Sequence, residues 1–260
     1  MLIALLLMAG LCAGFIDSIA GGGGLITLPT LGIAVGPGVH AIATNKIVGC
    51  SGALMALIVY MGSIRVPWAK ALGFSAWVML GSFSGSQVSP HLPQEFFQWF
   101  LLATYPVILW TVWKKDLWIQ EAVAPHTHEH TRGSRIHWAW GGAAHPRIMA
   151  AGLACGFYDG MWGPGGGTFM LLGLLLVARL PLLPAIAASK LANTVSAGTA
   201  LLGYSLHGLV HVREGLIMAM GMCVGAYLGA RLASKKAVVI VRPLLVAIST
   251  MLLLKNLLGF

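Results

Sequence analysis

Two aspartates stand inside apolar stretches of a chain that carries few charges. Asp17 and Asp159 are each followed by a run of glycines. An ionised carboxylate and an irregular backbone are both costly in hydrocarbon, and they are tolerated where protein buries them or where they line a wet cavity. The glycines are Gly21, Gly22, Gly23 and Gly24 after the first aspartate, and Gly163, Gly165, Gly166 and Gly167 after the second. We therefore take this doubled motif as the candidate working site.

The two carboxylates admit more than one role. An aspartate inside a membrane can relay protons or bind a cation. An aspartate ahead of a helix can instead cap it, by accepting hydrogen bonds from the first backbone N–H groups. The residues alone leave proton coupling and helix capping open for Asp17 and Asp159.

The glycine runs come just before short apolar segments that begin near Leu25 and Thr168. The unpaired N–H groups and the positive dipole end of a helix start form an anion site. Glycines can also serve only to let helices pack closely. A nucleotide-binding P-loop is not indicated, because the GxxxxGK[ST] pattern is absent from the sequence.

Each half of the chain has one lysine near the start of a long apolar segment. Lys46 follows Asn45, and Lys190 precedes Asn193 by three residues. A lysine near a helix end commonly extends its ammonium group to the membrane surface. The symmetric placement raises the alternative that both lysines and both asparagines line a path for an anion.

The composition places these residues in a membrane. Of the 260 residues, 58% are hydrophobic and only 9% are charged, whereas soluble domains carry about 25% charged residues. The formal charge of +9 fits the Lys- and Arg-rich cytoplasmic loops of membrane proteins better than a nucleic-acid partner. We expect an all-α polytopic membrane protein that has the lipid bilayer as its surroundings and binds no nucleic acid.

Ten apolar segments are expected. Most are long enough to cross a hydrocarbon core of about 30 Å, but 25–35 and 167–178 are too short and resemble half-helices beside the glycine breaks. The sequence does not say whether these two cross or turn back. The segments are 2–20, 25–35, 42–62, 69–89, 96–113, 147–162, 167–178, 186–206, 214–233 and 237–256.

The two halves of the chain align with each other. Asp17 lies over Asp159, an offset of 142 residues, and Tyr60 lies over Tyr204, an offset of 144 residues. An internal repeat of this size is typical of transporters. We expect a first transmembrane repeat at 1–116, a His-rich and basic linker at 117–146, and a second repeat at 147–260.

The basic residues predict the orientation of the repeats. If each half has three spans and a broken half-helix pair, eleven Lys or Arg fall on one side, against Lys46, Arg213 and Lys255 on the other. The positive-inside rule then favours inverted repeats, a cytoplasmic linker and both termini outside. The eleven are Arg65, Lys70, Lys114, Lys115, Arg132, Arg135, Arg147, Arg179, Arg231, Lys235 and Lys236.

The linker contains His126-Thr127-His128-Glu129-His130. Alternating histidines can bind nickel, cobalt or zinc loosely, so a divalent-metal permease is the alternative function, and a solvated loop is the simpler interpretation. The apolar segments hold no Ser/His/Asp or HExxH set, so an enzyme is not indicated. We expect no cofactor and no resident metal.

At this point the residues resemble a known family. The paired Gly-Phe-x-Asp motifs with their glycines, Ala-Thr-Asn-Lys at 43–46 and Ala-Ser-Lys-Leu-Ala-Asn at 188–193 are similar to those of the TauE/SafE family of sulfite and organosulfur-anion exporters. The resemblance covers nearly the whole chain. It implies a bacterial plasma-membrane (inner-membrane) secondary transporter for a small anion such as sulfite or sulfoacetate, with dependence on the proton gradient.

The resemblance also assigns the motif residues to the substrate site. By it, the glycines, Asn45, Lys46, Lys190 and Asn193 would bind the anion at the midplane. Pro164 interrupts the second glycine run and Ser189 replaces the first repeat's asparagine, so the two half-sites are not equivalent. The anion, the direction of transport, the coupling ion and the oligomeric state, including a homo-oligomer, are not fixed by the sequence.

Overall fold

The structure is a computed structural model that describes residues 1–93 and 145–257. The described residues form helices and no strands. The helices are α1 (Leu2–Ala20), α2 (Gly24–Val35), α3 (Val39–Met61), α4 (Trp68–Val88), a short 3₁₀ turn η1 (Ser89–His91), α6 (Pro146–Met161), α7 (Gly166–Leu172), a π-helical turn η2 (Gly173–Val177), α8 (Leu182–Leu206) and α9 (Val212–Leu257). The expectation of an all-α protein is therefore confirmed for this part of the chain.

Three of the described helices are long and apolar enough to cross a membrane: Leu2–Ile19, Val39–Met61 and Val212–Ser234. Their outer faces carry large apolar side chains, among them Ile58 and Leu216, each more than half exposed. In water so wide an apolar surface would favour aggregation, whereas in a bilayer it contacts lipid. The protein is membrane-embedded.

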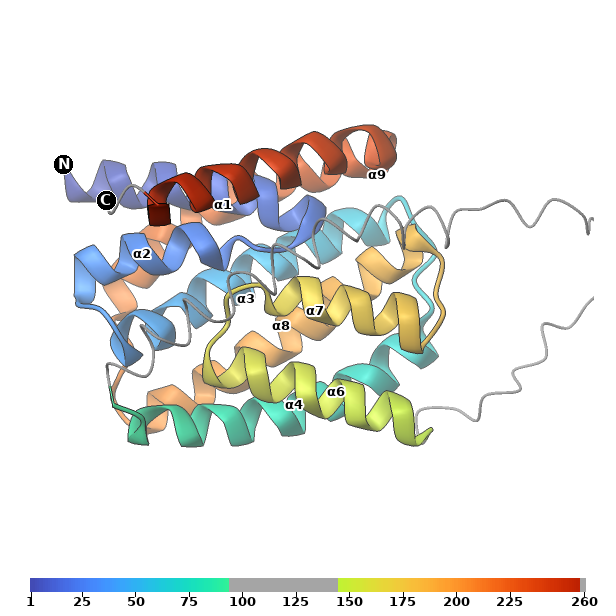
Figure 1. The fold of residues 1–260 in the computed structure, drawn as a ribbon, viewed down its shortest axis with the longest axis horizontal. Coiled ribbons are helices and arrows are strands. Elements are labelled where there is room, and N and C mark those ends of the chain that lie inside the picture. Colours follow the sequence, from blue (N-terminus) through green and yellow to red (C-terminus); the bar gives the residue numbers. More distant parts are fainter. Residues whose placement is uncertain (94–144, 258–260) are drawn as a thin grey trace, which may run out of the picture.

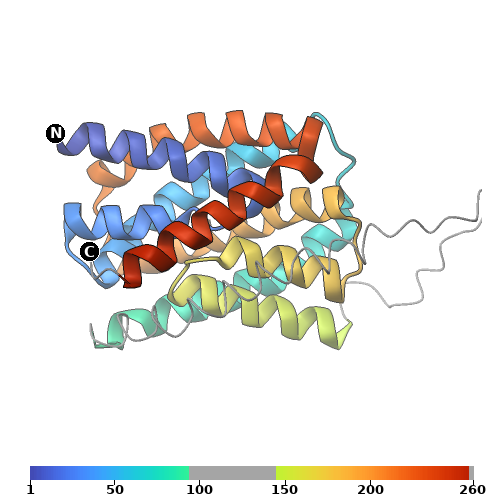
Figure 2. The same ribbon diagram turned by 45° about the horizontal axis from the view of Figure 1, so that its top comes forward.

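Two helix pairs enter the bundle from opposite ends. In Figure 1, α1 runs inward from the N-terminal end and α2 returns toward that end. Helix α6 starts at the opposite end and runs inward, and α7 returns toward that opposite end. The turned view agrees (Figure 2). The long helices α3 and α8 pack against each other between the two pairs. The start of α1 and the end of α9 lie at the same end of the bundle in both views (Figures 1 and 2).

Each pair packs most extensively on a helix from the other half of the sequence. Helix α1 lies against α9, and α6 lies against α4. Gly221 and Gly225 of α9 touch the α1 backbone, and Gly81 and Gly85 of α4 touch the α6 backbone. Small residues at four-residue spacing let helices approach closely where lipid provides no hydrophobic driving force. The two halves are thereby interlocked.

The expected segments agree with the helices within a few residues at most boundaries. The exception is the C-terminal pair 214–233 and 237–256, which the structure joins in one helix, α9. The polar Ser234-Lys235-Lys236 run lies inside this helix, so the expected interruption between the two segments is wrong. Figure 2 nevertheless shows α9 bending sharply, with its last part (red) running back. Segment 96–113 and His126–His130 lie outside the described residues.

The close glycine contacts generate a first prediction. A methyl group on Gly225 would overlap the carbonyl oxygen of Leu11, so Gly225→Ala should lower stability by about 1–3 kcal/mol through overpacking, despite alanine's better helix propensity. Gly198→Ala is the matched control, because its nearest new contact is Cys50 Sγ at 3.7 Å. Thermal unfolding of both variants in detergent tests this. Equal melting temperatures would contradict the interlocked packing.

Candidate functional site

Both glycine runs break the chain between a long helix and a short one. Helix α1 ends at Ala20 and α2 starts at Gly24, while α6 ends at Met161 and α7 starts at Gly166. The first glycine of each run has positive φ, 78° at Gly21 and 105° at Gly163, a region that side chains disfavour. The glycines thus let the chain reverse inside the bundle, which brings two short-helix starts near its middle.

The lysines and aspartates of the two halves pair crosswise. Lys46 Nζ of α3 lies 3.4 Å from Asp159 Oδ2 of α6, and Lys190 Nζ of α8 lies 3.0 Å from Asp17 Oδ2 of α1. Each ammonium group also donates a hydrogen bond to the backbone carbonyl of the same aspartate. All four residues are at most 7% exposed. Charges buried this deeply are stable only when paired.

The hydroxyls of two tyrosines hold the segments that carry the aspartates, each within its own half of the sequence. Tyr60 donates to the carbonyl of Ser18, and Tyr204 donates to the carbonyl of Gly160, each at 2.7 Å. Ser18 and Gly160 are the residues directly after the two aspartates. Tyr60 and Tyr204 therefore fix the C-terminal turns of α1 and α6, on which the carboxylates stand.

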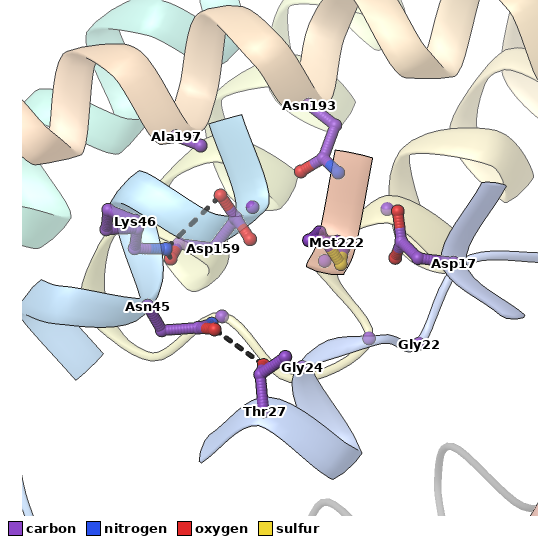
Figure 3. A pocket seen from close by; sticks show the side chains of 15 residues that line it. Asp17, Gly22, Gly24, Thr27, Asn45, Lys46, Asp159, Asn193, Ala197 and Met222 are labelled. Atoms are coloured by element: carbon purple, nitrogen blue, oxygen red, sulfur yellow. Dashed lines mark hydrogen bonds and ion pairs between the residues drawn. The ribbon is translucent and has the colours of Figure 1, made fainter. Parts of the chain in front are cut away.

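A small cavity lies between the two glycine breaks. Its volume is about 30 Å³, enough for a small ion or about one or two water molecules. Figure 3 shows side chains from both halves of the sequence pointing into it, with Asp17 and Asp159 on opposite sides. It is lined by Asp17, Gly22, Gly24, Thr27, Asn45, Lys46, Gly49, Asp159, Gly163, Gly165, Gly166, Gly167, Asn193, Ala197 and Met222.

Several residues that line this cavity have hydrogen-bond donors without an acceptor. Among the described residues, the backbone N–H groups of Gly22, Gly24 and Gly167 have no hydrogen-bond partner. The side-chain amide of Asn193 likewise makes no hydrogen bond within the described part of the chain, although the residue is only 8% exposed. Buried donors of this kind are normally satisfied. The arrangement can bind an oxyanion or ordered water.

Asn45 is held in place by its neighbour. Thr27 Oγ1 of α2 donates to Asn45 Oδ1 at 2.5 Å, which leaves the Asn45 amide nitrogen as a further donor toward the cavity (Figure 3). This bond ties the short helix of the first half to the long helix α3. It fixes which end of the Asn45 amide is presented.

The structure brings most of the predicted site residues together. Lys190, Gly21 and Gly23 are the predicted residues that do not line the cavity. Lys190 lies behind Asp17 as its partner, and Gly23 donates its N–H to Asp17 Oδ1 at 3.1 Å. Both lysines are buried, so the alternative in which they extend to the membrane surface is wrong. Substrate binding by these residues remains a prediction.

Sequence reasoning did not identify Ser196, Thr27 or Met222. Ser196 Oγ donates to Asp159 Oδ2 at 2.6 Å, and Met222 reaches the cavity from α9. One signal was available for α8, because Lys190, Asn193 and Ala197 recur at i, i+3 and i+7 and so share one helix face. Ser196 stands beside that face. Met222 has no sequence signal, because methionines are common in apolar helices.

The described residues contain no group of three or more His, Cys, Asp or Glu that could hold a metal ion. The expected metal alternative rested on His126–His130, which lie outside those residues. The described part of the chain therefore gives the metal alternative no support.

Comparison with known proteins decides the family. A family model described as "Sulfite exporter TauE/SafE" matches residues 6–256. The chain belongs to the TauE/SafE family. It is accordingly a membrane transporter, which is not a class of enzyme. The resemblance noted from the paired motifs is thus confirmed.

Curated relatives of the TauE/SafE transporter are similar over most of their length. The chain is 32% identical over 252 residues to "Probable membrane transporter protein YfcA" of Escherichia coli (strain K12), covering 97% of this chain and 88% of that protein. It is 32% identical over 256 residues to "Probable membrane transporter protein ORF9" of Sinorhizobium sp, covering 98% and 92%. No solved structure matches significantly.

The crosswise pairs generate a second prediction, for stability. Lys190→Gln leaves the buried Asp17 carboxylate unpaired and should cost about 3–5 kcal/mol. Combining it with Asp17→Asn removes both charges and should recover part of that loss, so the two substitutions are not additive. A double-mutant cycle by thermal unfolding in detergent tests the pair. Additive losses would mean that the two residues do not interact.

Proposed function

We propose that this TauE/SafE transporter is a secondary transporter that moves a small sulfur-containing anion, such as sulfite or sulfoacetate, in exchange for or together with protons. The observation that carries the proposal is the cavity between the two glycine breaks. It presents donors from Asn45, Asn193, Lys46 and the glycine backbone. The family supports the substrate class, since the matching model is described as a sulfite exporter.

The charges around the cavity support proton coupling. Two aspartates and two lysines sum to zero, and each lysine is already neutralised by an aspartate. An anion entering this site would leave a net negative charge in a region of low dielectric, where unbalanced charge is strongly unfavourable. For a singly charged anion such as hydrogensulfite, a proton bound to one aspartate restores neutrality and frees one lysine for the anion. Anion and proton binding would then favour each other.

The size of the cavity supports a small substrate. About 30 Å³ leaves room for an ion that makes direct contacts with the donors, while a bulky organic anion would require the walls to separate. Sulfite, with three oxygen acceptors, matches a ring of amide and ammonium donors. Sulfoacetate would need a more open conformation of the same site.

The arrangement of the halves supports inverted repeats. The α1–α2 and α6–α7 pairs enter from opposite ends (Figure 1), and each long-helix contact in one half has a counterpart in the other. We propose that the linker is cytoplasmic and both termini are outside, as the basic residues predict. Transport would follow from movement of one repeat against the other, which exposes the midplane site to each side in turn.

Sulfite flux in proteoliposomes tests the function. Purified protein should carry labelled sulfite saturably, and an imposed pH gradient should drive accumulation that collapses when the gradient is dissipated. Nickel and cobalt run in parallel should show no flux. Metal flux without sulfite flux would overturn the proposal.

The role of Lys46 is tested in the same assay. The paired change Lys46→Gln with Asp159→Asn keeps the cavity neutral, so the protein should fold, while sulfite flux should fall by about tenfold or more for the loss of a charge-assisted contact of about 1.5–3 kcal/mol. Lys70→Gln is the matched control, because Lys70 lies outside the cavity lining. Wild-type flux in the paired variant would exclude Lys46 as the anion's partner.

A further inference from the structure

The two lysine–aspartate pairs are related by the repeat but differ in how completely each carboxylate is satisfied. Asp17 has a donor on both oxygens. Lys190 Nζ lies 3.0 Å from Oδ2, and the Gly23 N–H lies 3.1 Å from Oδ1. Gly23 is the residue at the N-terminal cap of α2. Asp17 thus pairs with Lys190 and caps the short helix at the same time.

Asp159 is satisfied on one oxygen only. Its Oδ2 faces Lys46 Nζ at 3.4 Å and accepts from Ser196 Oγ at 2.6 Å. Its Oδ1 has no donor within the described part of the chain, and it lies against Gly166 at the start of α7. One carboxylate oxygen that is buried, without a donor and beside the cavity is a natural place for a proton.

The serine beside Asp159 has no counterpart in the first half. With the offset of 144 residues, Ser196 corresponds to Gly52, which packs against Met222. A hydroxyl group can donate a hydrogen bond to an ionised carboxylate. It can also accept a hydrogen bond from a protonated carboxyl group, because it is both a donor and an acceptor. Only the second-half aspartate has a hydroxyl partner, and this partner can stay hydrogen-bonded to the carboxyl group when Lys46 moves away.

The two lysines also differ in access. Lys46 lines the cavity, and Lys190 does not. Figure 3 shows Lys46 beside Asp159 at the cavity wall. An anion in the cavity can therefore compete with Asp159 for Lys46, whereas Lys190 has Asp17 between it and the cavity.

We propose that the two pairs have divided roles, which deepens and rests on the proposed function. Asp159 takes the coupling proton on Oδ1, and Lys46, released from it, binds the anion. Asp17 and Lys190 form a fixed pair that holds the first break together. The proton is transferred from a hydronium ion, whose O–H bond breaks to leave water, and it forms a new O–H bond on Asp159. The negative charge lost from the carboxylate is replaced by that of a singly charged anion such as hydrogensulfite.

The groups around Asp159 are few. Helix α3 contributes Lys46, α8 contributes Ser196 and the Tyr204 hydroxyl, and α6 itself carries Cys155 one turn earlier. Across the cavity, α1 contributes Asp17, with Lys190 behind it. Lys46 is thus the cation that directly neutralises Asp159, and its departure toward an anion favours protonation.

Carbodiimide labelling tests the assignment without requiring transport. N,N′-Dicyclohexylcarbodiimide adds to a protonated carboxyl group in an apolar site and leaves a stable N-acylurea. Full-length protein in detergent is treated across a pH series, and the two aspartate peptides are quantified by mass spectrometry. We expect label on the Asp159 peptide that increases as the pH falls and background label on the Asp17 peptide, which serves as the internal control. Equal labelling of both, or preferential labelling of Asp17, overturns the assignment.

The response of flux to a pH gradient gives a second readout in proteoliposomes. In Asp159→Asn, the ratio of sulfite flux with the gradient to flux without it should fall to unity. In Asp17→Asn, melting temperature should fall, while any remaining flux keeps its dependence on the gradient. The opposite pattern, with coupling lost only in Asp17→Asn, overturns the division of roles.

The proposed transport of sulfite and the division of roles between the two pairs can each be overturned separately. Selective, pH-dependent labelling of Asp159, with no sulfite flux in the wild-type protein, would retain the proton site and overturn sulfite as substrate. Saturable sulfite flux with equal labelling of both aspartates would retain the transport function and overturn the divided roles.

Discussion

The structure depends on two ion pairs that neither half of the chain can form alone. Each repeat supplies one lysine and one aspartate, and each residue finds its partner in the other repeat. In a region of low dielectric an unpaired charge is so unfavourable that the two halves must dock with Lys46 of α3 beside Asp159 of α6 and with Lys190 of α8 beside Asp17 of α1. The same requirement places both glycine breaks on either side of one small cavity. The chemistry of the site and the association of the repeats therefore have a common origin.

Close helix packing makes this docking possible. The α1–α9 and α4–α6 contacts run through glycines whose methyl-substituted forms would overlap the opposing backbone. Hydrogen bonds from Tyr60 and Tyr204 then fix the turns that carry the aspartates. Where the backbone leaves helical geometry, at the glycine runs, it faces the cavity rather than lipid, as the absence of water from the bilayer core requires.

Much of this could be predicted from the sequence. Apolar length and the glycine breaks located most helices, and the repeat offset put Lys46 and Lys190 at equivalent positions. The crosswise pairing could not be predicted, because equal spacing in both halves is equally compatible with pairs inside each repeat. Which lysine reaches the cavity depends on side-chain direction rather than on spacing. The continuity of α9 was missed because the polar Ser234-Lys235-Lys236 run resembles a loop between two apolar segments.

The inequivalence of the half-sites could be seen only in part. Ser189 in place of an asparagine and Pro164 in the second glycine run were visible as departures from symmetry. The more consequential difference, Ser196 against Gly52, became apparent when the structure placed the hydroxyl on Asp159. An internal repeat can therefore predict where a site lies without predicting which functional role each half of that site has.

The account's central claim is that the anion binds in the cavity between the two breaks, and the location of bound selenite tests it most directly. Selenite has the charge and shape of sulfite, and selenium gives an anomalous signal in crystals of the protein soaked or grown with it. The account predicts a peak within contact distance of Lys46 Nζ and the side chains of Asn45 and Asn193. Selenite bound only elsewhere, with this cavity empty at saturating concentration, would contradict it.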